Sequence, residues 1–381
     1  MRFWPRRRRA PLLAPSPDDL ALTEELLRPG LEGVFAVREC RLQSPAIVYR
    51  GQLLAAPGVV VERVARHFRP FGYTPFLRAD GGEIVLQALP VVAAAERPRV
   101  AVSLALFALT CVTTLVSGAL FFASPTFAPL GTGSPLATLL MGVPFAATLL
   151  AILGVHEFGH YFTARYHGAP VSLPYFIPAP PIVLFGTLGA IIRMRFPPRD
   201  RNALFDIAAA GPLAGLLVAV PALVLGLGWS SVDVVPPGEV VRLGDPLLLR
   251  WIVHLYFGRI PEGMDVFLHP VAVAGWAGFF VTALNLFPVG QLDGGRIAYA
   301  LFGRHHRAVG VATFAALLVL GVVTRSLNWF VWAVLLLVLV GFHHSPPLDD
   351  VTPLSPARRG LALVCLGLLV LLLPPVPISF D

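Results

Sequence analysis

Seven long apolar stretches determine what this chain of 381 residues can fold into. A helix needs roughly 20 mainly apolar residues to cross a bilayer, and each stretch approaches that length. The chain is 56% hydrophobic and only 13% charged, whereas soluble chains carry about 25% charged residues. We therefore predict a polytopic α-helical membrane protein with about six or seven transmembrane helices. The predicted spans are residues 100–122, 136–165, 203–228, 266–290, 307–323, 328–343 and 360–376.

Arginine placement predicts how these helices are oriented. All 29 residues of the Lys+Arg class are arginine. They gather in the N-terminal region and in segments 165–201, 296–307 and 358–359, which alternate with arginine-poor loops after the odd-numbered spans. The loop 229–265 departs from this pattern because it contains Arg242, Arg250 and Arg259, but acidic residues outnumber them, so we place it outside. Positive charge stays on the cytoplasmic side, so we expect a cytosolic N-terminus. Because the arginines flank apolar segments, the net charge of +7 indicates contact with the lipid bilayer and no nucleic-acid binding.

Several features narrow the chemistry and the location. The N-terminal MRFWPRRRR is basic but precedes no apolar segment, so we expect no secretory signal there. Cys40, Cys111 and Cys365 lack the spacing of a disulfide framework. Without lysine, neither a serine–lysine dyad nor a Schiff base can form. Arginine without lysine, with abundant Ala, Gly and Pro, is typical of a GC-rich bacterial genome, so we expect a multi-pass protein of a bacterial inner membrane.

The first part of the chain differs from the rest. Residues 1–98 intersperse charge with strand-like alternation, which predicts a small cytosolic α+β domain of unknown role. Residues 99–345 form the predicted membrane core, and residues 346–381 a C-terminal tail with a last transmembrane helix. Within the first domain we predict strands at Phe35–Leu42, Ala46–Leu54, Tyr73–Arg78 and Glu83–Leu89, and a helix at Gly58–Phe68.

Residues 171–198 interrupt the pattern of helices. Their sequence, VSLPYFIPAPPIVLFGTLGAIIRMRFPP, is apolar but too rich in proline and glycine for a helix. We predict a re-entrant, β-hairpin-like segment with two short arms around Phe185–Gly186. Irregular backbone at membrane depth must be buried in protein or line a wet cavity, so we expect a cavity nearby.

A cluster of ionisable residues lies near the cytosolic end of the second predicted span. His156, Glu157 and His160 form the pattern HEFGH. Residues four apart share one face of a helix, so both imidazoles can bind one zinc ion while Glu157 addresses a water molecule beside it. Contacts between helices are the alternative role for such histidines. Ionisable groups inside apolar helices cost about 2.5–3.5 kcal/mol each, which favours a functional role.

Such a zinc site needs a third protein ligand and one open position. The sequence just after HEFGH does not supply it, because the next histidine, His167, falls one residue late for the usual spacing. Asp206 and Asp293 are the candidates in apolar surroundings. We prefer Asp293, since its segment NLFPVGQLDGGR is interrupted by proline and glycine and can open toward a ligand. Asp206 lies at a helix start, which favours a bracing role.

HEFGH together with the distant NLFPVGQLDGG resembles the site-2 protease family of membrane-embedded zinc metalloproteases. The similarity is greatest to the branch that contains the chloroplast proteases called ethylene-dependent gravitropism-deficient and yellow-green, and their bacterial relatives. It covers roughly residues 30–345 and includes PYFIPAP, GTLGAIIRM, ALFDIAAAGPLAG and LHPVAVAGWAGFFVTALNLFPVGQLDGG.

The resemblance implies an intramembrane zinc metalloendopeptidase. Zn²⁺ would be bound by His156, His160 and Asp293, with Glu157 as the catalytic acid and base. Asn285 would face the substrate carbonyl, and an interhelical hydrogen bond is its alternative role. Substrates would be membrane-spanning proteins, cut near the cytosolic side. Their identity, any need for a prior cut by another protease, and the oligomeric state cannot be read from the sequence.

A transmembrane substrate must unwind before its peptide bonds can be cut, because a helix hides its carbonyls in hydrogen bonds. The 171–198 hairpin offers an edge to which an extended substrate can pair, so we expect Gly186, Thr187 and Gly189 to bind substrate. Sealing the cavity is the alternative role of the hairpin. A zinc or proton transporter and a catalytically inactive scaffold are the competing functions. The absence of a repeated polar motif disfavours a transporter, and the intact HEFGH and LDGG disfavour an inactive scaffold.

Overall fold

The computed structural model describes residues 17–91, 99–122, 134–181, 185–235 and 241–380. The basic segment at residues 1–9, in which we expected no secretory signal, lies outside them. The chain divides into two compact units. Unit 1 holds residues 1–94 together with 196–201 and 346–353, and unit 2 holds the remainder. The predicted first domain therefore has two additional segments from far along the chain.

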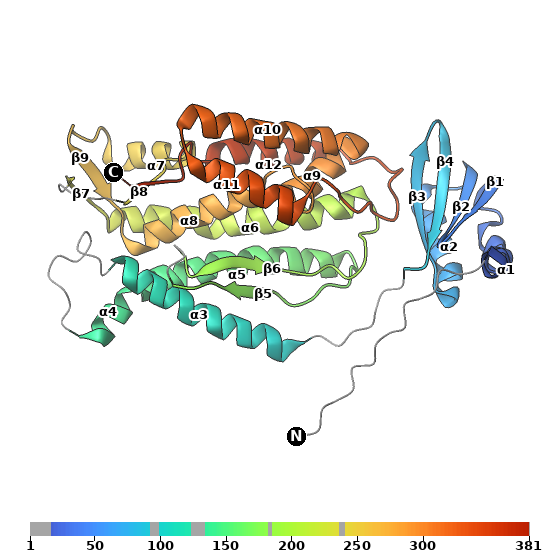
Figure 1. Ribbon diagram of the computed structural model, residues 1–381, viewed down its shortest axis with the longest axis horizontal. Coiled ribbons are helices and arrows are strands. Elements are labelled where there is room, and N and C mark those ends of the chain that lie inside the picture. Colours follow the sequence, from blue (N-terminus) through green and yellow to red (C-terminus); the bar gives the residue numbers. More distant parts are fainter. Residues whose placement is uncertain (1–16, 92–98, 123–133, 182–184, 236–240, 381) are drawn as a thin grey trace, which may run out of the picture. The chain divides into compact units, whose positions relative to one another are not determined.

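Unit 1 is built on a four-stranded antiparallel sheet with strand order β1-β2-β4-β3 (Figure 1). Val60, Val64 and Phe68 of its second helix repeat at helical spacing and are buried in the core of the unit. The strands and this helix lie within two residues of their predicted bounds. The elements are α1 (Pro17–Leu27), η1 (Arg28–Leu31), β1 (Phe35–Gln43), β2 (Ala46–Leu53), α2 (Pro57–Phe68), η2 (Arg69–Phe71), β3 (Thr74–Asp80) and β4 (Glu83–Leu89).

The two distant segments of unit 1 extend this sheet beyond β3. The backbone N–H of Leu77 donates to Leu348 O at 2.7 Å, and the N–H of Asp350 donates to Leu77 O at 2.9 Å. Segment 198–200 continues the pattern, because the N–H of Leu348 donates to Pro198 O at 3.0 Å. The Leu348 side chain is buried in the core of unit 1. Nothing in the local periodicity of these loops predicted this pairing.

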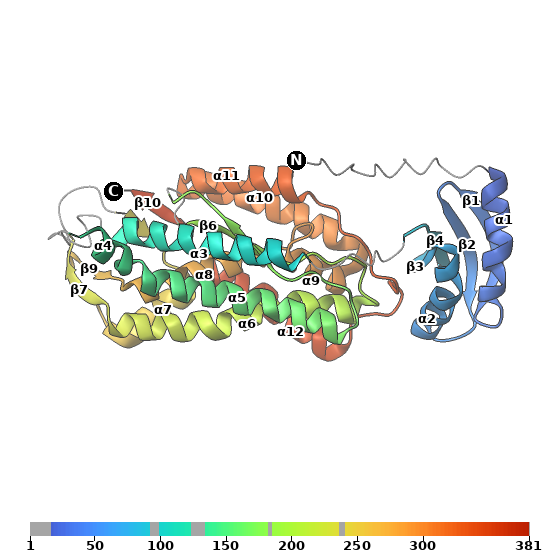
Figure 2. The same ribbon diagram turned by 90° about the horizontal axis from the view of Figure 1, so that it is seen from below.

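Unit 2 is helical, and the axes of its longer helices lie roughly along one line, parallel or antiparallel to one another (Figures 1 and 2). Its helices are α3 (Val100–Phe122), α4 (Pro135–Met141), α5 (Val143–Tyr166), α6 (Arg201–Gly228), α7 (Leu247–Phe257), α8 (Pro270–Asn285), α9 (Asp293–Phe302), η3 (Gly303–His305), α10 (His306–Thr324), α11 (Leu327–Leu335), the π-helical η4 (Leu336–Val340) and α12 (Pro356–Leu372). Its strands are β5 (Tyr175–Pro178), β6 (Thr187–Ile191), β7 (Ser231–Val234), β8 (Val241–Leu243), β9 (Met264–Phe267) and β10 (Ile378–Phe380), paired as β5–β6, β7–β9 and β8–β10.

Helix α8 forms the centre of unit 2, with most of its residues buried. Small residues let it approach its neighbours closely: a Cβ at Gly275 would overlap the backbone of Leu223 in α6, and one at Gly278 would lie 3.0 Å from Ile152 in α5. Close approach through small residues is how helices associate in lipid. The α5, α6 and α8 group therefore forms a tight frame for the side chains it carries.

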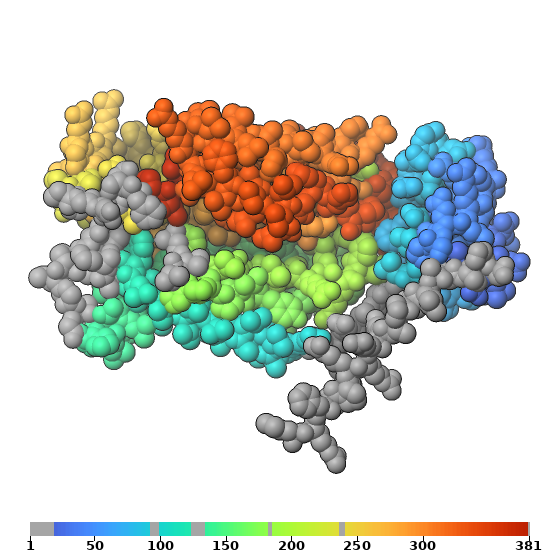
Figure 3. All heavy atoms as spheres, viewed as in Figure 1, coloured from blue at the N-terminus to red at the C-terminus, as the bar shows by residue number. Residues whose placement is uncertain are grey.

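The protein is a helix-rich membrane protein. Within the described residues, four helical segments are long and apolar enough to cross a bilayer: 100–122, 135–166, 201–228 and 293–324. Helices α10 and α11 cover one face of unit 2 (Figure 3) and expose apolar side chains such as Val323, at 74%, and Val331. A helical surface with such exposed apolar side chains is stable in contact with lipid. Helix α8, helix α11 together with η4, and helix α12 are each shorter than the roughly 20 residues that a bilayer-spanning helix needs. A total of six or seven spans therefore stays a prediction.

Two local differences from the predicted elements have clear causes. The span predicted at 266–290 ends early, because α8 stops at Asn285 and a turn with Pro288 and Gly290 follows. The segment 229–265, predicted as a loop, contains α7 and strands β7 and β9. Helix α7 has only 11 residues, which is too short to cross a bilayer, so the length of its apolar run did not predict a helix.

Candidate functional site

The HEFGH residues lie in the second half of α5 and point into the interior of unit 2. His156, Glu157 and His160 are all buried, with at most 5% of any of them exposed. The Nε2 atoms of the two histidines lie 3.2 Å apart, because residues four apart on a helix share a face. Two imidazole nitrogens therefore converge on one point.

Asp293 reaches the same point from another part of the chain. It is the first residue of α9, directly after the turn that ends α8. Its Oδ2 lies 3.1 Å from Nε2 of His160 and 3.5 Å from Nε2 of His156. The candidate ligand atoms of these three residues lie within 4.8 Å of one another. Asp293, which we preferred to Asp206 as the third ligand, therefore lies beside the two histidines.

Two glycines make the approach of Asp293 possible. A Cβ at Gly294 would collide with Leu286 O, and a Cβ at Gly295 would collide with the carbonyl oxygens of Val289 and Gly290. The first turn of α9 therefore packs directly on the backbone of the turn before it. Side chains at these two positions would push Asp293 away from the histidines, which explains the residue types in LDGG.

The ring of His160 is held in one orientation. Its Nδ1 lies 2.6 Å from Ile207 O in α6, and since a carbonyl only accepts, Nδ1 carries the proton and donates. The lone pair of Nε2 is then free toward His156 and Asp293. Metal-binding histidines are oriented in this way by a hydrogen bond from the other ring nitrogen.

The face of α6 opposite the histidines is made of glycine. A Cβ at Gly211 would overlap the ring of His160, and a Cβ at Gly215 would lie 3.2 Å from Nδ1 of His156. The segment GPLAG thus provides the space that the two rings occupy. The sequence analysis did not identify this role, although two glycines four apart in an apolar helix were the available signal.

Glu157 and Asn285 lie beside the cluster. The Glu157 carboxylate lies near the backbone N–H of Ile192, just after β6, so the end of the hairpin approaches α5 at this point. Asn285, the last residue of α8, places its amide nitrogen 3.3 Å from Nε2 of His156. That contact is an interhelical hydrogen bond and also brings the amide to the cluster, so it is compatible with both predicted roles of Asn285.

Asp206, the alternative third ligand, is engaged elsewhere. Arg358 donates to both of its carboxylate oxygens, at 2.7 and 2.8 Å. Nε2 of His167 lies 3.0 Å from Oδ2 of the same carboxylate. Asp206 therefore ties α6 to α12 and to the end of α5, which agrees with a bracing role.

The predicted arms of the hairpin are present as β5 and β6, antiparallel, with Tyr175 opposite Ile191. Gly186 has a φ of +63° and lies so close to Thr113 O in α3 that a Cβ would collide. Thr187 is buried and braces the turn, because its hydroxyl donates to Ile177 O at 2.8 Å and accepts from the N–H of Gly189 at 3.0 Å. Gly189 is open, with no atom near its Cβ position.

Comparison with known proteins identifies the helical core. Residues 144–326, which contain HEFGH and LDGG, match the profile described as peptidase family M50. This segment is therefore similar to the domain of peptidase family M50. The family resemblance inferred from the two motifs is thereby confirmed. No solved structure matches the chain significantly.

Relatives of the M50 domain occur in plants. The chain is 34% identical over 268 residues to "Probable zinc metalloprotease EGY2, chloroplastic" of Oryza sativa subsp. indica, which covers 66% of this chain and 46% of that protein. It is 34% identical over 241 residues to "Probable zinc metalloprotease EGY1, chloroplastic" of Arabidopsis thaliana, covering 61% of this chain and 43% of the relative. The chain thus spans less than half the length of these relatives.

The residues of the M50 domain fit the zinc cofactor that its relatives' names imply. Catalytic zinc sites use three protein ligands, commonly two histidines and a carboxylate, and keep a fourth position open. Two Nε2 atoms and one carboxylate oxygen converge here within 4.8 Å, with the His160 tautomer fixed as a ligand requires. Zn²⁺ is therefore the cofactor that suits this donor set. Within the described part of the chain, no other group of three such residues converges.

Proposed function

We propose that this protein is an intramembrane zinc metalloprotease that hydrolyses peptide bonds in or near transmembrane segments of membrane-protein substrates. The observation that carries the proposal is the cluster of the buried His156 and His160 with the partly buried Asp293, and Glu157 beside it, inside apolar helices. Ionisable groups at such a place are costly and are seldom kept without a function. The names of the relatives support the same activity.

The roles of the residues follow from their positions. His156, His160 and Asp293 would hold the zinc ion, which when bound supplies Lewis acidity that activates water and polarises a carbonyl. Glu157 takes the proton of the attacking water and delivers it to the leaving amine. Asn285 is placed to donate to the substrate carbonyl from the end of α8. The result is hydrolysis of one peptide bond.

The β6 strand is the proposed binding edge for an unwound substrate. The strand ends next to Ile192, whose N–H lies near Glu157, so a peptide paired along β6 would run toward the catalytic residues. Gly186 and Thr187 would contribute backbone, because the Thr187 hydroxyl is engaged within the hairpin. Exposed side chains such as Leu188, at 69%, would face an apolar substrate.

The arrangement in the membrane also belongs to this proposal. We propose six or seven spans with a cytosolic N-terminus, a re-entrant hairpin at residues 171–198, and an active site near the cytosolic side. The arginine distribution supports this orientation. The compositional signature supports a bacterial inner membrane as the location.

Purified protein in detergent tests the catalytic assignment. Zinc content and cleavage of a model transmembrane substrate are compared among wild type, Glu157→Gln and Asp293→Asn. We expect Glu157→Gln to keep zinc and lose about 10²–10⁴-fold in turnover, the usual contribution of general acid–base catalysis. Asp293→Asn should lose both zinc and activity.

Asp206→Asn is the matched control, since it also neutralises a partly buried aspartate that contacts a histidine but leaves the cluster intact. Its zinc content should equal that of wild type. If wild type binds zinc without cutting any substrate, and Glu157→Gln behaves identically, the protease assignment is wrong and a transporter or scaffold replaces it.

Proline substitution tests pairing along β6. Gly189→Pro removes the backbone N–H that donates to Thr187 and imposes a φ near −65°, so it should distort the edge of β6 and lower turnover while zinc content stays intact. Gly189→Ala keeps the N–H, has open space for its Cβ and shares the strain of a positive φ, which makes it the control. Equal turnover of the two variants would argue against pairing along this strand.

A further inference from the structure

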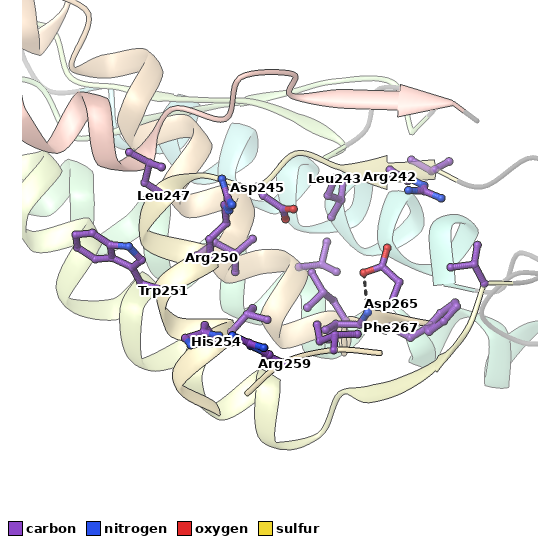
Figure 4. Close-up of a pocket in the computed structure, with 18 of the residues that line it drawn as sticks. Arg242, Leu243, Asp245, Leu247, Arg250, Trp251, His254, Arg259, Asp265 and Phe267 are labelled. Atoms are coloured by element: carbon purple, nitrogen blue, oxygen red, sulfur yellow. Dashed lines mark hydrogen bonds between the residues drawn. The ribbon is translucent and has the colours of Figure 1, made fainter. Parts of the chain in front are cut away.

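A second site lies at the end of unit 2 where α3 and α6 finish. Strands β8 and β9 and helix α7 line a pocket of about 780 Å³ there (Figure 4). Phe121, near the C-terminus of α3, and Val273, in the first turn of α8, also line it. These residues are at the opposite helix ends from Asp293 and Arg201, so the pocket is separate from the metal cluster.

The pocket carries both signs of charge. Arg250 and Arg259 line it together with His254, and so do the carboxylates of Asp245 and Asp265. Figure 4 shows both carboxylates directed toward the same space, with Arg250 beside Asp245. Partial burial and the neighbouring charge of Asp265 raise the pKa of Asp245, while Arg250 opposes the change. The electrostatic repulsion between two carboxylates that share a cavity decreases when a cation binds between them.

Helix α7 places this pocket at the surface of a membrane. Leu247, Trp251 and Leu255 are spaced four apart and share one face of the helix. All three are exposed, Leu255 by 85% and Trp251 by 60%. Tryptophan at the rim of apolar spans is typical of the level of the lipid headgroups. Since α3 and α6 end here, the mouth of the pocket lies where headgroups would lie.

We propose that this pocket binds the headgroup of a membrane phospholipid that carries both a phosphate and a primary ammonium, as phosphatidylethanolamine does. Arg250 and Arg259 bind the phosphate, because a guanidinium matches phosphate oxygens with two parallel hydrogen bonds. Asp245 and Asp265 accept from the ammonium. The acyl chains extend along the exposed apolar face of α7. The site is independent of the proposed proteolysis and is tested without it.

Lipid binding to the full-length protein tests the proposal. The protein is purified in mild detergent, exchanged with an equimolar mixture of phosphatidylethanolamine, phosphatidylglycerol and phosphatidylcholine, and examined by native mass spectrometry. Wild type should retain phosphatidylethanolamine in preference to the other two, which lack the primary ammonium. Arg250→Gln with Arg259→Gln should lower retention of all three by about tenfold, since charge-assisted hydrogen bonds to phosphate are strong. Asp245→Asn with Asp265→Asn should keep phosphatidylglycerol and lose the preference for phosphatidylethanolamine.

The control is Arg304→Gln with Arg307→Gln, which removes two exposed arginines near the start of α10. It should bind lipid as wild type does, and zinc content should be equal in every variant. Equal retention by the Arg250/Arg259 variant, or an equal loss in the control, overturns the proposal. So does an unchanged lipid preference in the aspartate variant. If the Arg250/Arg259 variant keeps its lipid but shows a raised KM for a membrane substrate, the pocket binds a segment of substrate and the lipid assignment is wrong.

Discussion

Gly211→Ala, which adds one methyl group, should empty the metal site although no proposed ligand is substituted. A Cβ at this position lies far inside van der Waals contact with Nε2, Cδ2 and Cε1 of His160. Ordinary contacts need about 3.5–4.0 Å, so the ring or α6 must shift by more than about 1 Å. Metal–ligand distances tolerate only about 0.2 Å. The Ile207 hydrogen bond to Nδ1 also resists rotation of the ring.

The expected magnitude follows from these displacements. Displacing an orienting group around a metal ligand typically costs about 10–100-fold in metal affinity, and Gly211→Ala moves the ligand itself, so we expect a loss at the upper end of that range. Overpacking costs about 1–3 kcal/mol, and the gain from replacing glycine by alanine in a helix, about 0.5–1 kcal/mol, offsets part of it. The protein should therefore fold with a small loss of stability and lose zinc and turnover together.

Two other glycines provide a graded series. Gly215→Ala places its Cβ 3.2 Å from Nδ1 of His156, a contact that a small shift accommodates, so zinc affinity should fall only a few-fold. Gly154→Ala lies in α5 itself with no atom near its Cβ position, and should keep zinc while gaining stability. Zinc is measured by mass spectrometry after dialysis against graded chelator, and stability by thermal unfolding. Wild-type zinc affinity in Gly211→Ala would refute the packing argument.

Two further predictions concern stability. Burial, followed by the nearby charges of Arg296 and His306, lowers the pKa of His344 to about 3. The unfolded chain takes up this proton near pH 6.5 and the folded chain does not, so stability should fall as pH drops from about 6.5, by up to about 1.4 kcal/mol per unit. His344→Phe should flatten the pH dependence of thermal unfolding, and an unchanged slope would contradict the argument. Leu348→Ala should cost unit 1 about 2–5 kcal/mol, seen as faster amide exchange in β3 while exchange in α5 stays constant.

Local sequence patterns predicted the elements that local physics determines. Alternation of apolar residues located β1 to β4 in unit 1, and the valines of α2 repeat at helical spacing. The proline- and glycine-rich arms of the hairpin appear as β5 and β6. HEFGH placed two imidazoles and a carboxylate on one turn of α5, because the spacing of a helix is fixed.

Pairing between distant segments left no such pattern. Segment 346–353 pairs with β3 and segment 196–201 pairs with 346–353, both through backbone groups, which every residue carries, so no residue type marks them. Gly211 and Gly215 read as ordinary small residues of an apolar helix until the rings of His160 and His156 are placed against them. Helix α7 was missed because its apolar run fits neither a span nor a loop. In each case the sequence did not show which distant element packs against the segment.

The choice between Asp206 and Asp293 shows how the opposite element decides a role. Both aspartates lie in apolar sequence near the N-terminal ends of their helices, and in the sequence only the proline and glycine residues around Asp293 distinguish them. Arg358 and His167 contact the carboxylate oxygens of Asp206. A metal ion at Asp206 would therefore have to displace the bidentate ion pair with Arg358. Asp293 instead faces the Nε2 atoms of His156 and His160, and no arginine pairs with it among the ion pairs of the described residues. A buried carboxylate in that position is stabilised most by a metal ion that the same nitrogens can also bind.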